Sequence, residues 1–493
     1  MNMKIKAIAT LSLVFSFIMA ASGCGVQSEI TDTTTFAGSE ETSTENAVTT
    51  TEAPDLPETN MNGKTFTFFT ERWDNYAPID IDDLTAEEIN GEILNDRAYE
   101  RQKNIEERFN CVIEQLSYNN SDFNQLLNAI SAGEDAYQIA LFRATHFNKL
   151  LTSGYLSALD TIPYLDLEAD WYDTNSFETL RVLGRNLGIV SDITMTTNKM
   201  VGCTYFNQNM AEDYGIGDIY DLVDTGKWTW DALYSFGQLA ASDLNNDGKF
   251  TIDDRFGFSY INDIPVCLLQ SGGVTFATLD KDGIPTITFA EESNISKMEN
   301  LWNILADTAT SYNVHQRSVN YNRDEVGIFI DGHALFTLAG IYYAPQFRDM
   351  KDDFGIIPLP KYDEEQDSYR SPVFTSTFII TGVPVTNNDP ENTGMIIEEL
   401  AYEGYRDIRP AFYDVTLQGK ITRDDTSNRM LDLIFSSTCY DPGLAYDFGN
   451  INSTMAKHIS KLTGDFASSF ASIKDKAQTN IDKMIEEIES TQN

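Results

Sequence analysis

Between residues 64 and 142 the chain alternates stretches of strand spacing with stretches of helical spacing, and this alternation limits its fold more than any other feature. Residues 64–69 alternate polar and aromatic side chains, as a strand does. Apolar residues then recur at helical spacing from 94 to 109, a strand begins at Cys111, a helix begins near Asp122, and residues 137–142 read as a third strand. Strands that alternate with helices predict an α/β fold.

A second region of strands begins near Gly202 and continues past Pro360. An apolar strand is predicted over residues 374–383, and Asp389-Pro390-Glu391 then predicts a helix N-terminus, because proline suits the first helical turn. Apolar residues every three or four positions over 466–488 predict an amphipathic helix that packs on the body. With 493 residues, 42% of them hydrophobic, the chain is long enough for two domains or lobes.

The first 24 residues indicate export and a lipid anchor. Lys4 and Lys6 precede an apolar run over residues 7–20, which suits a signal sequence and is too short to span a bilayer. Ala21-Ser22-Gly23-Cys24 resembles a lipobox, so we expect residues 1–23 to be a lipoprotein signal peptide and Cys24 to be lipidated. The alternative is an ordinary secretory signal with a chance cysteine. Residues 24–62, rich in Thr, Ser and Glu, predict a disordered tether.

Charge and cysteine content narrow the partners and the redox chemistry. The formal net charge of −42 repels phosphate backbones and anionic lipid surfaces, so nucleic acid is not an expected partner. Beyond Cys24, the cysteines are far apart in apolar surroundings, with no C-x-x-C pair: Cys111, Cys203, Cys267 and Cys439. We expect them to be small buried hydrophobic residues. One or two disulfides are the alternative outside the cytosol.

Residues 243–254 have the spacing of a calcium loop, in which six or more oxygens converge on the ion. The expected metal ligands, at loop positions 1, 3, 5, 7 and 12, are Asp243, Asn245, Asp247, the Lys249 carbonyl and Asp254. Asp254 stands where an EF-hand has Glu, which makes the loop closer to those of dockerin-like proteins. Residues 255–258 predict a strand, whereas the loop of an EF-hand is followed by a helix. We therefore expect one structural Ca²⁺ site and not a pair of sensor sites. The alternative is a charged loop held by side chain to backbone hydrogen bonds.

Catalytic signatures are missing from the sequence. None of the four histidines belongs to an H-E-x-x-H motif, and no G-x-S-x-G elbow occurs. Gly63-Lys64-Thr65 looks like the end of a P-loop, but Glu58 stands where its first glycine should be. With 76 acidic residues, a chance carboxylate pair carries no weight as a glycosidase signature. The sequence therefore predicts a protein that is not an enzyme and needs no organic cofactor.

Aromatic residues near predicted strand ends and loops are the remaining candidates for binding. An aromatic ring can stack on the C–H face of a pyranose, while polar side chains hydrogen bond to its hydroxyls. The alternative for each ring is packing in the core. The candidates are Trp73, Tyr76, Trp171, Tyr172, Trp228, Trp230, Tyr342 and Tyr343.

Several segments, taken in order, carry a family resemblance over about residues 63–450. They are residues 97–112, 205–216, 226–231, 332–336, 340–342 and 354–361. Behind a lipobox and a tether, this order resembles the extracellular solute-binding proteins of family 1, the maltose-binding-protein-like receptors of carbohydrate ABC importers. The resemblance implies a two-lobed, type II periplasmic-binding-protein-like fold with a ligand cleft between lobes that hinge strands join. The implied lobes are residues 63–195 plus 378–430 and residues 200–372 plus 435–493. The implied crossings between them lie near residues 189–204 and 372–380.

The resemblance also implies positions for the ligand. A family aromatic that stacks on sugar corresponds to Tyr342, which follows Gly340-Ile341. The loop after the first strand and the end of the third strand face the cleft in the family, which nominates Trp73 and Arg143. Glycines let the backbone approach a ligand closely. The full predicted ligand-binding set is Trp73, Arg143, Trp228, Trp230, Gly272, Gly273, Tyr342 and Tyr343.

Together these features predict a receptor on the extracytoplasmic face of the cell membrane, lipid-anchored through Cys24, in a Gram-positive bacterium. We expect it to capture a carbohydrate, an oligosaccharide, and to deliver it to the permease subunits of an ABC transporter. Two alternatives stay open. One is a surface-anchored glycoside hydrolase or lyase, and the other is a ligand-sensing lipoprotein that feeds a signalling partner.

Overall fold

The structure is a computed structural model that describes residues 52–72, 80–119, 122–317, 325–348, 350–375, 377–416 and 425–490. The chain divides into Met1–Thr51 and a compact unit, Glu52–Asn493, and the description concerns the second unit. The predicted signal peptide, Cys24 and most of the predicted tether lie outside the described residues, as do Trp73 and Tyr76.

The packed part of the chain begins before the predicted boundary at residue 63. Leu56 and Met61 are buried among apolar residues of the first lobe. The Met61 backbone N–H also donates to the Phe109 carbonyl at 2.7 Å. Two apolar side chains and a backbone hydrogen bond thus hold the end of the Thr- and Glu-rich stretch against the body.

The first lobe is built on a four-stranded sheet of order β12-β3-β1-β2. Strands β1, β2 and β3 are parallel, and β12 pairs antiparallel with β3, with Ile379 opposite Arg143. Phe66 and Phe68 of β1 pack into one apolar cluster and Phe69 into another, so both faces of the sheet are covered. The strands are β1 Lys64–Arg72, β2 Cys111–Asn119, β3 Ile139–Arg143 and β12 Ile379–Gly382.

The second lobe is built on a five-stranded sheet of order β10-β4-β9-β5-β8. Strand β4 is antiparallel to both of its neighbours, whereas β9, β5 and β8 are parallel. Every residue of these five strands is buried, as expected for a sheet with helices on both faces. The strands are β4 Gly202–Asn207, β5 Phe256–Tyr260, β8 Ser311–Asn313, β9 Ala334–Gly340 and β10 Phe354–Pro358.

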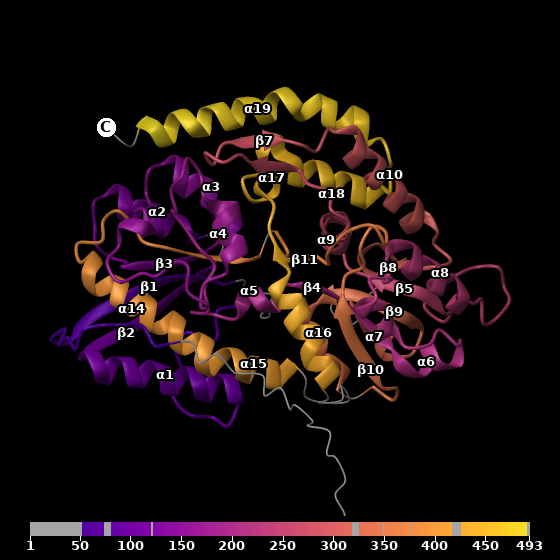
Figure 1. Ribbon diagram of the computed structural model, residues 1–493, viewed down its shortest axis with the longest axis horizontal. Helices are drawn as coiled ribbons and strands as arrows, with labels where there is room; N and C mark the ends of the chain where they lie inside the picture. The colour runs from indigo at the N-terminus through magenta and orange to yellow at the C-terminus, as the bar shows by residue number, and fades with distance from the viewer. Residues whose placement is uncertain are drawn as a thin grey trace, which may run out of the picture. The chain divides into compact units, whose positions relative to one another are not determined.

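Helices flank both sheets, as Figure 1 shows. Helices near the first sheet are α1 Ile93–Phe109, α2 Asn124–Ser131, α3 Ala144–Thr152, α4 Thr174–Leu180, α14 Pro390–Glu403 and α15 Arg409–Thr416. Those near the second are α6 Gln208–Asp213, α7 Ile219–Asp224, α8 Trp230–Ala240, α9 Ile264–Ser271, α10 Glu292–Ala306, α11 Val314–Arg317, α13 Gly327–Ile330 and α16 Asp425–Ser436. Asp389 caps α14 by accepting from the Asn392 backbone N–H, as the sequence predicts.

Two neighbouring segments connect the lobes. Residues 189–201 and 373–381 run antiparallel, with bridges between Ile189 and Thr381 and between Val201 and Val373. The first segment contains α5, Thr196–Lys199, and the second follows β11, Ser371–Pro372, which pairs with β13, Thr438–Cys439. The strand predicted over 374–383 is therefore wrong in extent, because it includes β12 and also part of a connection between lobes.

The end of the chain forms α17 Pro442–Ala445, α18 Ile451–Lys461 and α19 Phe466–Ser490. Helix α19 contacts α3 near the first sheet as well as α10 and β7, Pro285–Ile287, of the second lobe, and it lies along the top of Figure 1. The prediction of an amphipathic helix here is confirmed, since Phe466, Phe470 and Ile481 are buried.

Two further properties concern the described residues alone. No helix among them has the length and apolar character needed to cross a membrane. The four described cysteines are free thiols, with Cys111, Cys203 and Cys267 buried and Cys439 half-buried, so the expectation of unpaired, mostly buried cysteines is confirmed.

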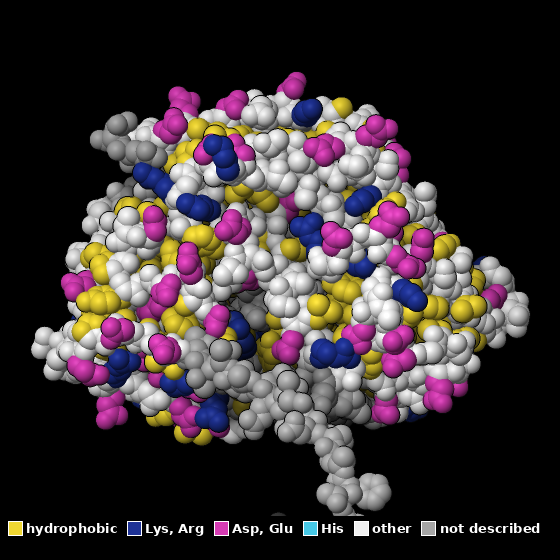
Figure 2. All heavy atoms as spheres, in the orientation of Figure 1, with side chains coloured by type: hydrophobic (Ala, Val, Ile, Leu, Met, Phe, Trp, Pro, Cys, Tyr) yellow, Lys and Arg dark blue, Asp and Glu magenta, His cyan; other side chains and the backbone are white. Residues whose placement is uncertain are grey.

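Acidic side chains are spread over the face drawn in Figure 2, in keeping with the net charge of −42.

Candidate functional site

A cavity of about 330 Å³ lies where strands of both lobes end. Thr145 follows β3 of the first lobe, and Asn262 and Asp263 follow β5 of the second. Ligands of α/β sheets bind beyond the carboxyl ends of the strands, and the volume lies in the range of about 300–1,000 Å³ usual for ligand sites. The other lining residues are Val266, Cys267, Phe374, Thr375, Asn452, Met455, Ala456, Ile459 and Ser460.

Next to Thr145, the first lobe carries a charged cluster at its strand ends. The Arg143 guanidinium donates from Nε to Glu71 at 2.8 Å, and His146 Nδ1 lies 2.6 Å from the other Glu71 oxygen. The His146 ring stacks on Phe123 with centroids 3.8 Å apart. Arg143 and Glu71 are both buried, and a buried charge needs a partner of opposite sign. Each supplies that partner to the other, and their ion pair joins the ends of β1 and β3.

The second lobe carries a polar network behind Asn262. The Asn262 backbone N–H donates to His315 Nδ1 at 3.2 Å, and His315 Nε2 lies 3.2 Å from Glu325. The Tyr343 hydroxyl donates to the second Glu325 oxygen. Burial raises the pKa of the Asp263 carboxyl, and the Glu325 charge adds to this shift while His315 opposes it. The network thus holds Asn262, a lining residue of the cavity, against His315 and Glu325.

Tyr342 and Tyr343 lie at the end of β9 on the edge of this region. Their ring centroids are 4.1 Å apart, Tyr343 is buried, and Tyr342 is half-buried. A Cβ placed on Gly340 would meet the Tyr342 ring at 2.6 Å and the Phe374 ring, a cavity wall, at 3.2 Å. Of the predicted set, Arg143 and Tyr342 are thus neighbours of the lining residues Thr145 and Phe374, but none of Arg143, Tyr342 and Tyr343 lines the cavity itself, and their contact with a ligand stays a prediction.

The other predicted residues meet at the far end of α9. Trp228 is 0% exposed and donates from Nε1 to the Pro358 carbonyl at 2.9 Å. Trp230 is also buried, and its ring occupies the space that a Cβ on Gly272 would need, at 2.3 Å. Helix α9 starts at the cavity and is about 12 Å long. The structure gives these rings packing partners within the second lobe; ligand contact of Trp228, Trp230, Gly272 and Gly273 stays a prediction.

The acidic loop over 243–254 folds through its own hydrogen bonds. Asp243 accepts from the Gly248 N–H at 2.7 Å, and Asn245 accepts from the Asp247 N–H at 2.8 Å. Both Asp254 oxygens accept backbone N–H groups, from Leu244 and Thr251, which holds the pKa of Asp254 below its usual range. Gly248 adopts a φ of +78°, as the turn at loop position 6 requires. In the described part of the chain, no group of three or more His, Cys, Asp or Glu side chains is arranged to hold a metal.

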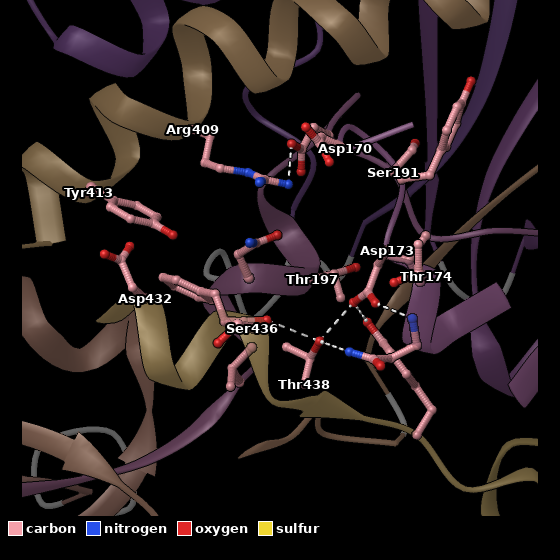
Figure 3. A pocket seen from close by; sticks show the side chains of 18 residues that line it. Asp170, Asp173, Thr174, Ser191, Thr197, Arg409, Tyr413, Asp432, Ser436 and Thr438 are labelled. Carbon is pink, nitrogen blue, oxygen red and sulfur yellow. Dashed lines mark hydrogen bonds and ion pairs between the residues drawn. The ribbon is translucent and has the colours of Figure 1, made fainter. Parts of the chain in front are cut away.

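A larger cavity of about 430 Å³ lies by the connection between the lobes, as Figure 3 shows. Its polar groups are largely paired with one another: Asp173 accepts from Thr438 at 3.0 Å and from Tyr440 at 2.7 Å, and Arg409 forms an ion pair with Asp192. No strand of either large sheet ends among its described lining residues, which come instead from α4, α5, α15 and α16 and their flanking segments. We therefore place the candidate site in the smaller cavity.

Sequence reasoning missed Asn262, Asp263 and the wall that α18 supplies. A signal existed for the first two, since they come a few residues after the strand predicted at 255–258, which the structure extends to Tyr260 as β5. No signal existed for α18, because the position of a C-terminal helix over a cavity depends on packing far from its own sequence.

Comparison with known proteins places this geometry in a fold class. No protein-family model and no curated protein matches the chain. Among solved structures, an ABC substrate-binding protein from Listeria monocytogenes in complex with cycloalternan is 14% identical, with a TM-score of 0.54 over 86% of this chain and 99% of that one. The galacto-N-biose/lacto-N-biose I-binding protein of a Bifidobacterium longum ABC transporter is 13% identical, with a TM-score of 0.54 over 86% and 98%. UspC of M. tuberculosis is 15% identical, with a TM-score of 0.57 over 84% and 100%.

The chain thus has the two-lobed, periplasmic-binding-protein-like α/β fold, and the predicted fold class is confirmed. Within that class, its fold is that of the maltose-binding-protein-like receptors of ABC transporters.

Proposed function

We propose that this protein is a solute receptor that captures a carbohydrate in the cavity between its lobes and delivers it to the permease of an ABC transporter. The observation that carries the proposal is the position of the cavity, which collects Thr145 and Asn262 from the strand ends of two separate lobes. Solved proteins of the same fold are described as complexes with cycloalternan, maltotetraose and lacto-N-biose.

The chemistry of the cavity suits a neutral ligand with many hydroxyls. Amide, hydroxyl and carboxyl groups of Asn262, Thr145 and Asp263 can hydrogen bond to hydroxyls, while Phe374 and Met455 offer apolar surface to a sugar ring. Asp263 is the one acid among the described lining residues, whereas most glycosidases act with two carboxyl groups. This favours a binding protein over the alternative of a hydrolase or lyase.

A titration of the full chain with maltotetraose, lacto-N-biose and cycloalternan tests the proposal, read by calorimetry and by melting temperature. We expect at least one of these saccharides to bind and to raise the melting temperature, with the sugar recovered unchanged by mass spectrometry. Shortened or unsaturated products would establish the hydrolase or lyase. No response to a broad saccharide panel, together with a response to peptides, would reject carbohydrate as the ligand.

Export and lipid anchoring are part of the proposal and rest on the sequence. A lipid on Cys24 would hold the receptor at the extracytoplasmic face of the membrane, while residues 25–51 give it reach toward a permease. Mass spectrometry of the mature N-terminus tests this. A diacylated Cys24 is expected, and an unmodified terminus at another residue would exclude the anchor. Co-purification with membrane permease subunits separates transport from the alternative of feeding a signalling partner.

Calcium binding at residues 243–254 is also part of the proposal, and it can be tested separately from saccharide binding and lipid anchoring. The turn at Gly248 and the inward carboxylate of Asp243 suit a calcium loop, and each carboxylate oxygen that accepts one N–H keeps a lone pair for a metal. Calorimetric titration with Ca²⁺ tests it, with Asp243→Asn plus Asp247→Asn as the matched variant. Uptake by the natural chain and loss in the variant are expected. A melting temperature that Ca²⁺ leaves unchanged in both would show that hydrogen bonds alone hold the loop.

A further inference from the structure

The side-chain amide of Asn262 can present either of two faces to the candidate carbohydrate cavity, which this residue lines. One face is the acceptor Oδ1, and the other is Nδ2 with its two N–H donors. Rotation of the amide exchanges the two, so the surrounding hydrogen bonds determine which of them remains for a ligand. That orientation decides whether Asn262 offers a donor or an acceptor to a saccharide hydroxyl.

Asn313, the last residue of β8, fixes this orientation. Its Oδ1 accepts the backbone N–H groups of His315 at 3.1 Å and of Gln316 at 3.2 Å. Because a backbone N–H can only donate, Oδ1 of Asn313 must lie on that side of its amide and Nδ2 on the other. Nδ2 then donates to Asn262 Oδ1 at 3.2 Å. Asn313 is 3% exposed, so contacts within the protein hold its amide in place.

With its Oδ1 engaged, Asn262 keeps the two N–H groups of Nδ2 for another partner. No described residue accepts a hydrogen bond from them, and the Asn262 side chain is exposed. The Asn262 backbone is held separately, since its N–H donates to His315 Nδ1 at 3.2 Å. Backbone and amide are therefore both oriented before a ligand arrives, which lowers the ordering cost of binding.

The adjacent Asp263 supplies the complementary acceptor. Its carboxylate is half-buried, lines the same cavity and accepts no hydrogen bond from another described residue. A hydroxyl group both donates and accepts, so a saccharide hydroxyl can accept from Asn262 and donate to Asp263. A reversed Asn262 amide would instead place two acceptors next to each other and leave the hydroxyl oxygen without a donor from this pair.

We infer that Asn313 is a positioning residue of the carbohydrate site, which keeps the N–H donors of the Asn262 amide available to a saccharide hydroxyl. Asn313 does not line the cavity, so it acts on a ligand only through Asn262. The inference rests on the proposed function and adds to it a rule of specificity. The saccharide must offer a hydroxyl beside Asn262 and Asp263, and a sugar that lacks this hydroxyl should bind less tightly.

Asn313→Asp tests the inference, because aspartate has the same shape but lacks the N–H donors. At alkaline pH, where the introduced carboxyl is ionised, it still accepts the two backbone N–H groups, so the melting temperature should be kept. Asn262 must then reverse its amide to donate to Asp at position 313. Calorimetry of the full chain with maltotetraose, lacto-N-biose and cycloalternan should show an affinity about tenfold lower for each saccharide that binds, the usual effect of one hydrogen bond.

The matched control is Asn209→Asp on α6 of the same lobe. Asn209 Oδ1 accepts the Asp353 backbone N–H at 2.9 Å, and aspartate keeps this contact while adding the same charge. We expect the control to bind each saccharide as the natural chain does. Because these saccharides are neutral, the loss in Asn313→Asp should also persist at high salt, which screens an effect of charge.

A double-mutant cycle with Asn262→Ala separates positioning from a merely structural role. Asn262→Ala removes the amide, so adding Asn313→Asp should cost no further affinity. The inference is overturned if a saccharide binds the natural chain and Asn313→Asp equally well, or if Asn313→Asp weakens binding as much in the Asn262→Ala background. If none of the three saccharides binds the natural chain, the proposed function itself fails, and the inference fails with it.

Discussion

Tyr342 combines a fixed position with an accessible ring at the end of β9. Its ring contacts Tyr343, it is half-buried, and Gly340 leaves room for it beside Phe374, which lines the candidate cavity. A ring held in this way loses little freedom when a sugar stacks on it.

Replacing Tyr342 by Ala should therefore weaken saccharide binding by about 1–3 kcal/mol, the contribution of a buried aromatic contact. Calorimetry with the saccharide identified for the natural chain gives the affinity. The matched control is Tyr164→Ala, at an exposed tyrosine of the first lobe, which should leave the affinity unchanged. An unaltered affinity in Tyr342→Ala would remove Tyr342 from the site.

Glu398 makes the stability of the first lobe depend on pH. Burial raises the pKa of its carboxyl to about 7, although hydrogen bonds from the Tyr172 hydroxyl, the Asp166 backbone N–H and the Trp171 indole N–H oppose the shift. An unfolded glutamic acid titrates near 4.5. Between these two values the folded chain binds more protons than the unfolded chain, so the contribution of Glu398 to the free energy of unfolding falls as pH rises through this window.

We expect the free energy of unfolding of Glu398→Gln to fall less steeply than that of the natural chain between about pH 4.5 and 7, because glutamine does not titrate. Urea denaturation at several pH values measures the difference in slope. Glu107→Gln, at an exposed position of α1, is the control and should follow the natural chain. Parallel curves for the natural chain and Glu398→Gln would show that Glu398 is not buried as an acid.

Among the elements, α19 shows how a local pattern becomes a tertiary contact. Phe470 is fully buried, with its ring centroid 5.0 Å from that of Phe289 and 6.0 Å from that of Phe466. Ile473, less than one turn away, is half-buried at the edge of the same contact.

Phe470→Ala should lower the free energy of unfolding by about 3–5 kcal/mol, the usual cost of truncating a buried phenylalanine. Ile473→Ala is the matched variant on the same helix and should cost clearly less. Chemical denaturation of both variants gives the comparison. If the two substitutions cost the same small amount, α19 is not docked on the body in solution.

Sequence patterns predicted elements where the pattern is local and failed where the outcome depends on distant packing. The alternation over residues 64–69, the cap at Asp389 and the stripe of α19 each carry their own signal, and all three match the structure. The apolar run over 374–383 does not by itself reveal that it crosses between lobes, because burial in a connection and in a strand look alike; only the family resemblance implied a crossing near residues 372–380. For the same reason the sequence does not show that the Trp228 and Trp230 side chains are buried in the second lobe.

The sequence pointed to the neighbourhood of the candidate site and not to its lining. Arg143 and Tyr342 were reached through strand ends and a family resemblance; each adjoins a lining residue, Thr145 or Phe374, and ligand contact by either stays a prediction. Asp263 and the α18 wall were not reached, since they become neighbours only when two lobes and the C-terminal helices come together.

At the scale of the whole molecule, the candidate cavity has lining residues from both lobes. Residues 189–201 and 373–381 are two of the segments that connect these lobes. A ligand that touches Thr145 and Asn262 together should favour one arrangement of the lobes over others, since it gains contacts from both in that state alone. Hydrogen exchange of the full chain, with and without saturating saccharide, can follow this. We expect slower exchange at the junction after β3 and at the junction after β5, and no change in α1, which lies away from the cavity. Protection at one junction alone would place the ligand within a single lobe and would contradict a site shared by the two.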